Sequence, residues 1–204
     1  MLILASASPR RRELLSQAGL DFTVESADIN EDVQSEEAAA KYVQRLAVEK
    51  AQAVLALHPK AAGAEDRVVV LGADTCVLYN GEILGKPLDQ ADARRMLELL
   101  SGRTHQVLTG VAAVSHAAMV SGVEITQVYF DVITGPEMVR YLASGEPLDK
   151  AGAYGIQGYA ARWIPKIEGC YFNVMGLPLA RTVALLAELD DKEAAAIASP
   201  QAIR

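Results

Sequence analysis

Hydrophobic positions along the chain form short continuous runs that alternate with longer stretches of helical spacing. The runs at 2–5, 22–24 and 68–71 are typical of strands, and the third, VVVL, is largely β-branched, as in a strand buried on both faces. Between them, apolar residues recur every three or four positions, which predicts helices. The alternation therefore predicts an α/β fold. We expect helices from residue 10 onward and over 38–57, 89–100, 136–143 and 179–189, and further strands at 76–79, 82–84, 104–114, 125–133, 164–167 and 171–174.

Two of the strand connections leave a mark in the sequence. Asn80-Gly81 lies between two apolar runs, which is the strongest short-range signal of a β-hairpin. The two long runs at 104–114 and 125–133 are joined by a loop that we expect to span 115–122. Antiparallel hairpins beside buried strands predict mixed pairing within one sheet.

The length and the composition predict one ordinary domain. A chain of 204 residues can bury a core as one domain or one two-lobed unit, and 51% hydrophobic with 22% charged residues is usual for a soluble globular protein. From residue 190 onward the sequence is polar and rich in alanine, which predicts a frayed end. We therefore expect a single domain over 1–189 and a polar C-terminal tail over 190–204.

Charge and cysteine content exclude several classes of function. A formal net charge of −7 argues against non-specific binding of nucleic acid, since that requires a basic surface. Two cysteines, Cys76 and Cys170, make neither a disulfide framework nor a metal cluster, so a reducing, cytoplasmic setting is expected. No apolar run approaches the roughly 20 residues of a membrane span, and the N-terminal MLIL is too short for a signal peptide.

A serine-rich turn followed by arginines, LASASPRRRELL from Leu4 to Leu15, is the first candidate site. Ser8 stands where a helix N-cap belongs and Pro9 suits the first helical position. Such a turn directs backbone N–H groups, a hydroxyl and guanidinium groups to one point, which favours phosphate. The alternative is that Ser8 only caps a helix and the arginines are solvated. Against it, three arginines at a helix N-terminus are disfavoured by a few tenths to about 1 kcal/mol, a penalty that a bound anion would remove.

A carboxylate among small residues follows the buried run at 68–71. Asp74, in the sequence GADT, is poorly explained by packing, because a buried unpaired charge is costly unless a metal or cation is near. We therefore predict a functional role for Asp74. Lys50 is typical of a solvated helix face. Lys86 lies in Gly-Lys-Pro, where Pro87 replaces the serine or threonine of a Walker A loop. This excludes a Walker A loop and leaves open that Lys86 contacts a phosphate from a rigid turn.

A glycine-rich segment from Leu148 to Gly158, LDKAGAYGIQG, surrounds Gln157. Its glycines suggest a backbone close to a ligand, although a simple loop explains them nearly as well. There is no GxGxxG, HExxH or GxSxG motif, which disfavours a dinucleotide cofactor, a zinc protease site and a serine nucleophile elbow. With the acidic stretch at 28–37, these residues suit phosphoryl chemistry on a nucleotide with a divalent metal held by carboxylates.

At this point the chain resembles the Maf family of nucleoside triphosphate pyrophosphatases. Matching blocks keep their order over about the first 180 residues, among them SASPRRRELL at 6–15, YVQRLAVEKA at 42–51 and GADT at 72–75. The resemblance implies an α/β fold like that of the inosine triphosphate pyrophosphatases, with an elongated mixed β-sheet flanked by helices and two lobes around a cleft. It also implies a homodimer.

The resemblance implies a role for each candidate residue. Asp74 matches the catalytic carboxylate, and Glu31 matches an acidic position near a Mg²⁺ or Mn²⁺ ion that Asp74 would share. Arg10, Thr75 and Gln157 match positions that determine substrate specificity. The polar and basic positions that would bind phosphate are Ser8, Arg11, Lys50 and Lys86.

SPRR together with GAYGIQG resembles the branch of the family that acts on dTTP and UTP. The Gln157 carboxamide can pair with the imide edge of uracil or thymine, and such a site rejects bases that leave its polar atoms unpaired. The expected reaction is attack on the α-phosphorus by a water that Asp74 deprotonates, with release of pyrophosphate, in nucleotide-pool house-cleaning. Two alternatives stay open: a nucleotide-sensing regulator of cell division, suggested by the family's older name of septum formation protein, and the same reaction on purine or modified nucleotides.

Overall fold

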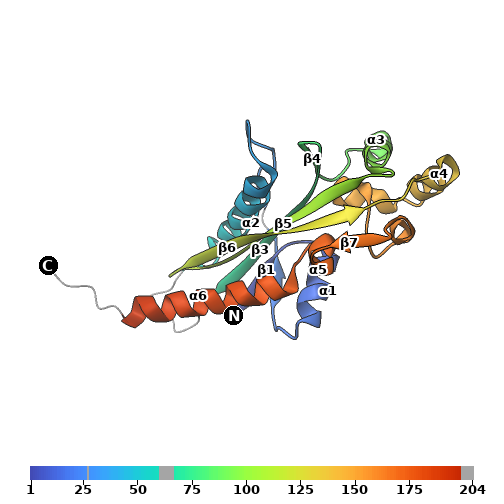
Figure 1. Ribbon diagram of the computed structural model, residues 1–204. Helices are drawn as coiled ribbons and strands as arrows, with labels where there is room; N and C mark the ends of the chain where they lie inside the picture. The colour runs from blue at the N-terminus through green and yellow to red at the C-terminus, as the bar shows by residue number, and fades with distance from the viewer. Residues whose placement is uncertain (27, 60–66, 199–204) are drawn as a thin grey trace.

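Seven strands form one mixed sheet in the computed structural model, which describes residues 1–26, 28–59 and 67–198 (Figure 1). The strand order is β2-β1-β3-β5-β6-β7, and β4 pairs with β3 off this path. β1 is parallel to β2 and β3, whereas the remaining pairs are antiparallel. The predicted mixed α/β sheet is thereby confirmed, and it is open, with β2 and β7 at its edges. The strands are β1 (Leu2–Ala5), β2 (Thr23–Glu25), β3 (Val69–Tyr79), β4 (Glu82–Leu84), β5 (Thr104–Ser115), β6 (Met119–Tyr129) and β7 (Lys166–Glu168).

Helices cover both faces of the sheet (Figure 1). α2 packs on one face through Ala47, Ala51 and neighbouring apolar residues, and α1, α5 and α6 pack on the opposite face. α3 and α4 cover the far ends of the long strands β5 and β6. The helices are α1 (Pro9–Gln17), α2 (Ala39–Leu55), α3 (Gln90–Leu100), α4 (Gly135–Ala143), α5 (Tyr171–Met175) and α6 (Leu179–Ala198), with 3₁₀ turns η1 (Glu146–Asp149), η2 (Ala151–Ala153) and η3 (Tyr159–Trp163).

Two glycines in the sheet allow α2 to lie directly against it. A Cβ at Gly72 would stand 2.1 Å from the Ala47 carbonyl oxygen, and a Cβ at Gly110 would stand 2.2 Å from that of Val43. These distances are far below van der Waals contact, so any side chain here would push the helix away. This close approach fixes the height of α2, and therefore of Lys50, above β3.

The structure corrects two strand boundaries near the centre of the sheet. The run at 68–71 does not end before Asp74, because β3 continues to Tyr79. The Asn80-Gly81 turn then leads into β4. The expected loop at 115–122 is much shorter, since β6 begins at Met119. The Ser115 hydroxyl accepts hydrogen bonds from the Ala117 and Ala118 amides at 3.1 Å and so turns the chain within three residues.

Two predictions in the C-terminal part are wrong. Residues 171–174 form helix α5 rather than a strand, because a short apolar run does not distinguish the two, and Gly176 ends the helix with φ 109°. α6 does not fray at Asp190 but continues to Ala198. Arg67, just before β3, pairs with both Asp190 and Glu193 and so ties this part of α6 to the start of β3. Residues 199–204 of the expected tail lie outside the described part of the chain, and the division at residue 189 stays a prediction.

Candidate active site

The candidate site lies at a break in the sheet on the β1 side of β3. The pairing of β1 with β3 ends at Ala5 and Gly72, and β4 first pairs with β3 at Val77. Among the described residues, no strand pairs with the β3 backbone on that side between these points. Asp74 and Thr75 lie in this break, beside the turn that leaves β1. Ligand sites in open α/β sheets commonly lie just beyond the carboxyl ends of strands, which is where this break occurs.

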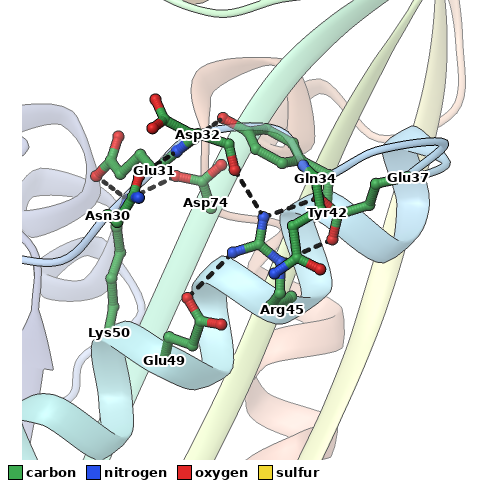
Figure 2. A network of polar contacts seen from close by, with 10 residues as sticks. All are labelled: Asn30, Glu31, Asp32, Gln34, Glu37, Tyr42, Arg45, Glu49, Lys50 and Asp74. Atoms are coloured by element: carbon green, nitrogen blue, oxygen red, sulfur yellow. Dashed lines mark hydrogen bonds and ion pairs between the residues drawn. The ribbon is translucent and has the colours of Figure 1, made fainter.

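On the α2 face, one ammonium group joins two carboxylates. Lys50 Nζ lies 2.6 Å from Asp74 Oδ1 and 2.7 Å from Glu31 Oε1 (Figure 2). The side chains of Asp74 and Lys50 are 10% and 14% exposed, whereas that of Glu31 is 55% exposed. The buried charge of Asp74 therefore has the cationic partner that the sequence required, and Glu31 covers the pair from the solvent side.

The charges around Glu31 keep it ionised. Burial opposes ionisation, but the hydrogen bond from Lys50 and the positive charges of Lys50, Lys86 and Arg11 outweigh it and hold the pKa of Glu31 below its usual range. Lys86 itself is exposed at the bend after β4. Its positive charge is one of the three that lower the pKa of Glu31.

On the opposite face, Arg11 is held by four groups. Ser8 caps α1, as predicted, and its hydroxyl accepts from the Arg11 amide at 3.5 Å. The Arg11 guanidinium donates to the Gly176 carbonyl at 2.8 Å, to Thr75 Oγ1 at 3.0 Å and to Ser6 Oγ at 3.3 Å. Burial lowers the pKa of Arg11, and the nearby Asp74 carboxylate partly restores it. The serine turn therefore directs an oriented cation towards the break in the sheet.

The Thr75 hydroxyl belongs to a buried hydrogen-bond chain. It lies 2.9 Å from the Thr109 hydroxyl, which donates to the Asn173 carbonyl at 3.1 Å. The Asn173 amide in turn donates to the Val107 carbonyl at 3.0 Å. In this arrangement Thr75 fixes Arg11 against β5 and α5.

Arg10 joins α1 to the glycine-rich segment. Its guanidinium donates to Asp149 Oδ2 at 2.9 Å and to the Asp149 carbonyl at 3.2 Å, and Lys150 contacts the same carboxylate at 2.6 Å. Gln157 is exposed in a turn closed by a hydrogen bond from the Gly158 amide to the Gly155 carbonyl. The preceding residue, Ile156, packs in the same apolar cluster as Leu14 and Leu15 of α1. The segment therefore lies against the helix that carries Arg10 and Arg11.

The predicted residues thus form three groups around α1 and β3. Asp74, Lys50 and Glu31 are in direct contact, as are Ser8, Arg11 and Thr75. Arg10 is tied to the segment that holds Gln157, but no hydrogen bond in the described part of the chain joins Gln157 to another predicted residue. The sequence interpretation missed four residues that hold these groups in place: Ser6, Tyr42, Arg45 and Asp149. Tyr42 and Arg45 had a usable signal, since they lie on the same predicted helix as Lys50, eight and five residues before it.

The donor set of the site fits a metal ion only in part. Within the described ranges, no three His, Cys, Asp or Glu side chains gather into a group that could hold a metal. Glu31 and Asp74 supply two carboxylates that share the Lys50 ammonium. Two carboxylates fit Mg²⁺ when substrate phosphates and water supply the other ligands, which is its usual mode of binding.

The fold is an open mixed α/β sheet, and the site at the break beside β3 combines oriented cations with paired carboxylates. This combination is typical of proteins that bind a polyanion. The chain belongs to the Maf family: the family model described as Maf-like protein matches residues 1–189. No helix in the described part of the chain combines the length and apolarity needed to cross a membrane.

Proteins of three bacteria illustrate the similarity. A dTTP/UTP pyrophosphatase of Hahella chejuensis is 50% identical over 191 residues, covering 94% of this chain and 93% of that protein. One of Colwellia psychrerythraea is 53% identical over 188 residues, covering 91% and 87%. One of Bacillus pumilus is 49% identical over 185 residues, covering 91% and 94%.

Proposed function

We propose that the chain is a nucleoside triphosphate pyrophosphatase that hydrolyses dTTP and UTP to the nucleoside monophosphate and pyrophosphate. Relatives of about 50% identity over nearly the whole chain carry the name dTTP/UTP pyrophosphatase. The observation that carries the proposal is the Lys50 bridge between Asp74 and Glu31 beside the Arg11 turn. It brings a carboxylate and oriented cations to one break in the sheet, and these are the groups that attack on a phosphorus atom requires.

In the proposed mechanism, Asp74 orients the attacking water and takes its proton. Lys50 fixes the direction of the Asp74 carboxylate through the 2.6 Å contact. Arg11, Lys86 and the Ser8 turn bind the phosphates and stabilise the charge that develops on the leaving pyrophosphate. Asp74, Lys50 and Arg11 are on regular elements and Ser8 caps α1, so these groups are placed before the substrate arrives.

A divalent cation, Mg²⁺ or Mn²⁺, completes the proposed site. Asp74 and Glu31 would hold it together with the phosphates of the substrate. When bound, the ion supplies charge neutralisation and lowers the pKa of a coordinated water. The positive field that keeps Glu31 ionised keeps that ligand ready at neutral pH.

Base selection is assigned to the segment beside α1. Gln157 would pair with the O4 and N3–H groups of thymine or uracil, because its carboxamide offers one donor and one acceptor. Arg10 would act from the edge of the same segment, where Asp149 holds its guanidinium. Thr75 would act indirectly, since its hydroxyl is engaged by Arg11 and Thr109. A cytoplasmic homodimer that removes unwanted nucleotides is the setting we propose.

The experiment that tests this function is pyrophosphate release from a panel of purine and pyrimidine nucleoside triphosphates, with Mg²⁺ and with Mn²⁺. We expect dTTP and UTP to be hydrolysed fastest, because the O4 and N3–H groups of thymine and uracil match the donor and acceptor of Gln157, whereas the edges of adenine and cytosine do not. Gln157→Ala should lower the preference for dTTP and UTP over purine nucleotides by roughly tenfold or more. Without the carboxamide, a purine no longer leaves polar atoms of the site unpaired. Gln90→Ala, at the start of α3, is the matched control. Tight binding of dTTP without release of pyrophosphate would contradict the enzyme and favour the nucleotide sensor.

A further inference from the structure

The loop that carries Glu31 has no regular structure to hold it. Residues 28–38 contain neither helix nor strand, and most of their side chains are exposed. Even so, Glu31 Oε1 lies 2.7 Å from Lys50. Ile29 is partly buried against the apolar cluster that contains Tyr42, but the backbone at and after Glu31 depends on polar contacts.

Arg45 of α2 makes those contacts (Figure 2). Its guanidinium holds Glu37 through two hydrogen bonds, Nε to Oε1 at 2.7 Å and a terminal nitrogen to Oε2 at 2.8 Å. The same terminal nitrogen donates to the Asp32 backbone carbonyl at 3.0 Å. The side chains of Arg45 and Glu37 are only 19% and 9% exposed, so this pair is well shielded from water. The bidentate geometry adds rigidity that a single ion pair lacks.

Tyr42 adds a second contact to the backbone of the same loop. Its buried phenol donates to the Glu31 carbonyl at 3.0 Å. Arg45 lies with its guanidinium carbon 5.7 Å from the centre of the Tyr42 ring. Consecutive carbonyls, those of Glu31 and Asp32, are therefore held by two side chains one helical turn apart. We call Tyr42, Arg45 and Glu37 the loop clamp.

The loop clamp and Lys50 hold different parts of the same residue. Lys50 binds the Glu31 carboxylate, whereas Tyr42 and Arg45 bind the backbone at and just after Glu31. All three come from one helix, α2, at positions 42, 45 and 50. If a cation or phosphate displaces the carboxylate from Lys50, the backbone contacts still fix where Glu31 stands.

We propose that Arg45 is a positioning residue, which acts through Glu37 and the Asp32 carbonyl to keep Glu31 in place for the reaction. The proposal rests on the proposed function, in which Glu31 is a ligand of the metal. Arg45 touches neither the reacting atoms nor Asp74. Its effect on turnover must therefore pass through Glu31, and this sets it apart from a residue that only stabilises the fold.

The test combines kinetics with amide exchange on Arg45→Met, Arg45→Lys, Glu31→Gln and the double variant Arg45→Met with Glu31→Gln. Arg45→Met should lower kcat for dTTP by about tenfold to a hundredfold, as a displacement of about 1 Å does in other active sites. In the Glu31→Gln background the same substitution should lower kcat less than about twofold, because the two residues act as one unit. Arg45→Lys should recover only part of the loss, since an ammonium cannot make the bidentate contact.

Exchange without nucleotide tests the clamp separately from the reaction. In Arg45→Met, amides of the segment 28–38 should exchange about tenfold faster, including that of Gln34, which donates to Glu37 Oε2. Arg95→Met is the matched control, because Arg95 pairs with two carboxylates, as Arg45 does with Glu37 and Glu49, but contacts no part of this loop. Unchanged exchange would overturn the proposal, as would an equal loss of kcat in both backgrounds. If exchange rises while Glu31→Gln keeps full activity, the clamp stands and the role proposed for Glu31 is the part that fails.

Discussion

Adjacent residues of one strand serve opposite faces of the sheet at this site. Side chains alternate along a strand, so Asp74 faces α2 and meets Lys50, whereas Thr75 faces α1 and meets Arg11. In the described part of the chain no strand covers the β1 side of β3 at this point, so both environments lie beside the same break in the sheet. A shift of one residue in the register of β3 would exchange the two environments, leaving Asp74 without Lys50.

A second residue-scale feature is the buried, neutral His105. Its ring lies 2% exposed against Phe130 and Tyr154, and its Nε2 is 2.8 Å from the Tyr154 hydroxyl. The other ring nitrogen has no hydrogen-bond partner within the described ranges of the chain. Burial lowers the pKa of His105 to about 3. In the unfolded chain histidine takes up a proton near pH 6.5, so stability is greatest above that pH and falls as the pH drops towards 3.

His105→Gln should reduce this acid sensitivity. Between pH 7 and pH 5, protonation of this histidine in the unfolded chain should lower the free energy of unfolding by about 2 kcal/mol, because the folded state stays unprotonated over that interval. Glutamine does not titrate, so the fall in the variant should be smaller by about that amount. Urea unfolding at the two pH values measures it. His116→Gln, at an exposed histidine, should leave the fall as it is in the parent protein. An identical fall in parent and His105→Gln would contradict the account.

At the scale of elements, α2 is the part of the fold that organises the site. It supplies Lys50 and the loop clamp, and its distance from the sheet is set by Gly72 and Gly110. Backbone atoms of the helix stand where a Cβ would be, and backbone cannot move aside as a flexible side chain can. The position of the proposed catalytic pair therefore depends on two residues that carry no chemistry.

Gly72→Ala should accordingly damage both stability and activity. The new methyl group would lie 2.1 Å from the Ala47 carbonyl oxygen, so α2 must shift, at a cost of about 1–3 kcal/mol or more. Lys50 would move with the helix, so pyrophosphate release should fall as well. Gly135→Ala is the matched control, because a Cβ there meets no atom within 4 Å. Thermal unfolding and pyrophosphate release measure the two effects, and a Gly72→Ala variant with parental stability would refute this view of the helix packing.

At the scale of the whole molecule, local patterns predicted the elements better than their assembly. The N-cap at Ser8 and the Asn80-Gly81 hairpin follow from local backbone preferences and are confirmed. The continuation of β3 past Gly72 is not visible locally, because small residues weaken a strand pattern that the neighbouring strand β5 restores. Helix α5 was missed because five residues show no usable periodicity.

The candidate residues were found through chemistry and family resemblance, but their partners were not. Arg11 contacts Gly176, which is 165 residues away along the chain, and Arg10 contacts Asp149 across 139 residues. No local pattern reports such pairs. The division of Asp74 and Thr75 between two faces likewise required the sheet, since it depends on which strand ends where.

The measurement that tests the central claim most directly is pyrophosphate release from dTTP by Asp74→Asn, beside its affinity for dTTP. Asparagine keeps the shape of the side chain but cannot take the proton of the water. We predict a loss of turnover of roughly two to four orders of magnitude with binding changed only a few-fold. Asp21→Asn, at an exposed carboxylate between α1 and β2, should match the parent protein. Near-normal turnover in Asp74→Asn would contradict the assignment of Asp74 as the base and, with it, this account of the site.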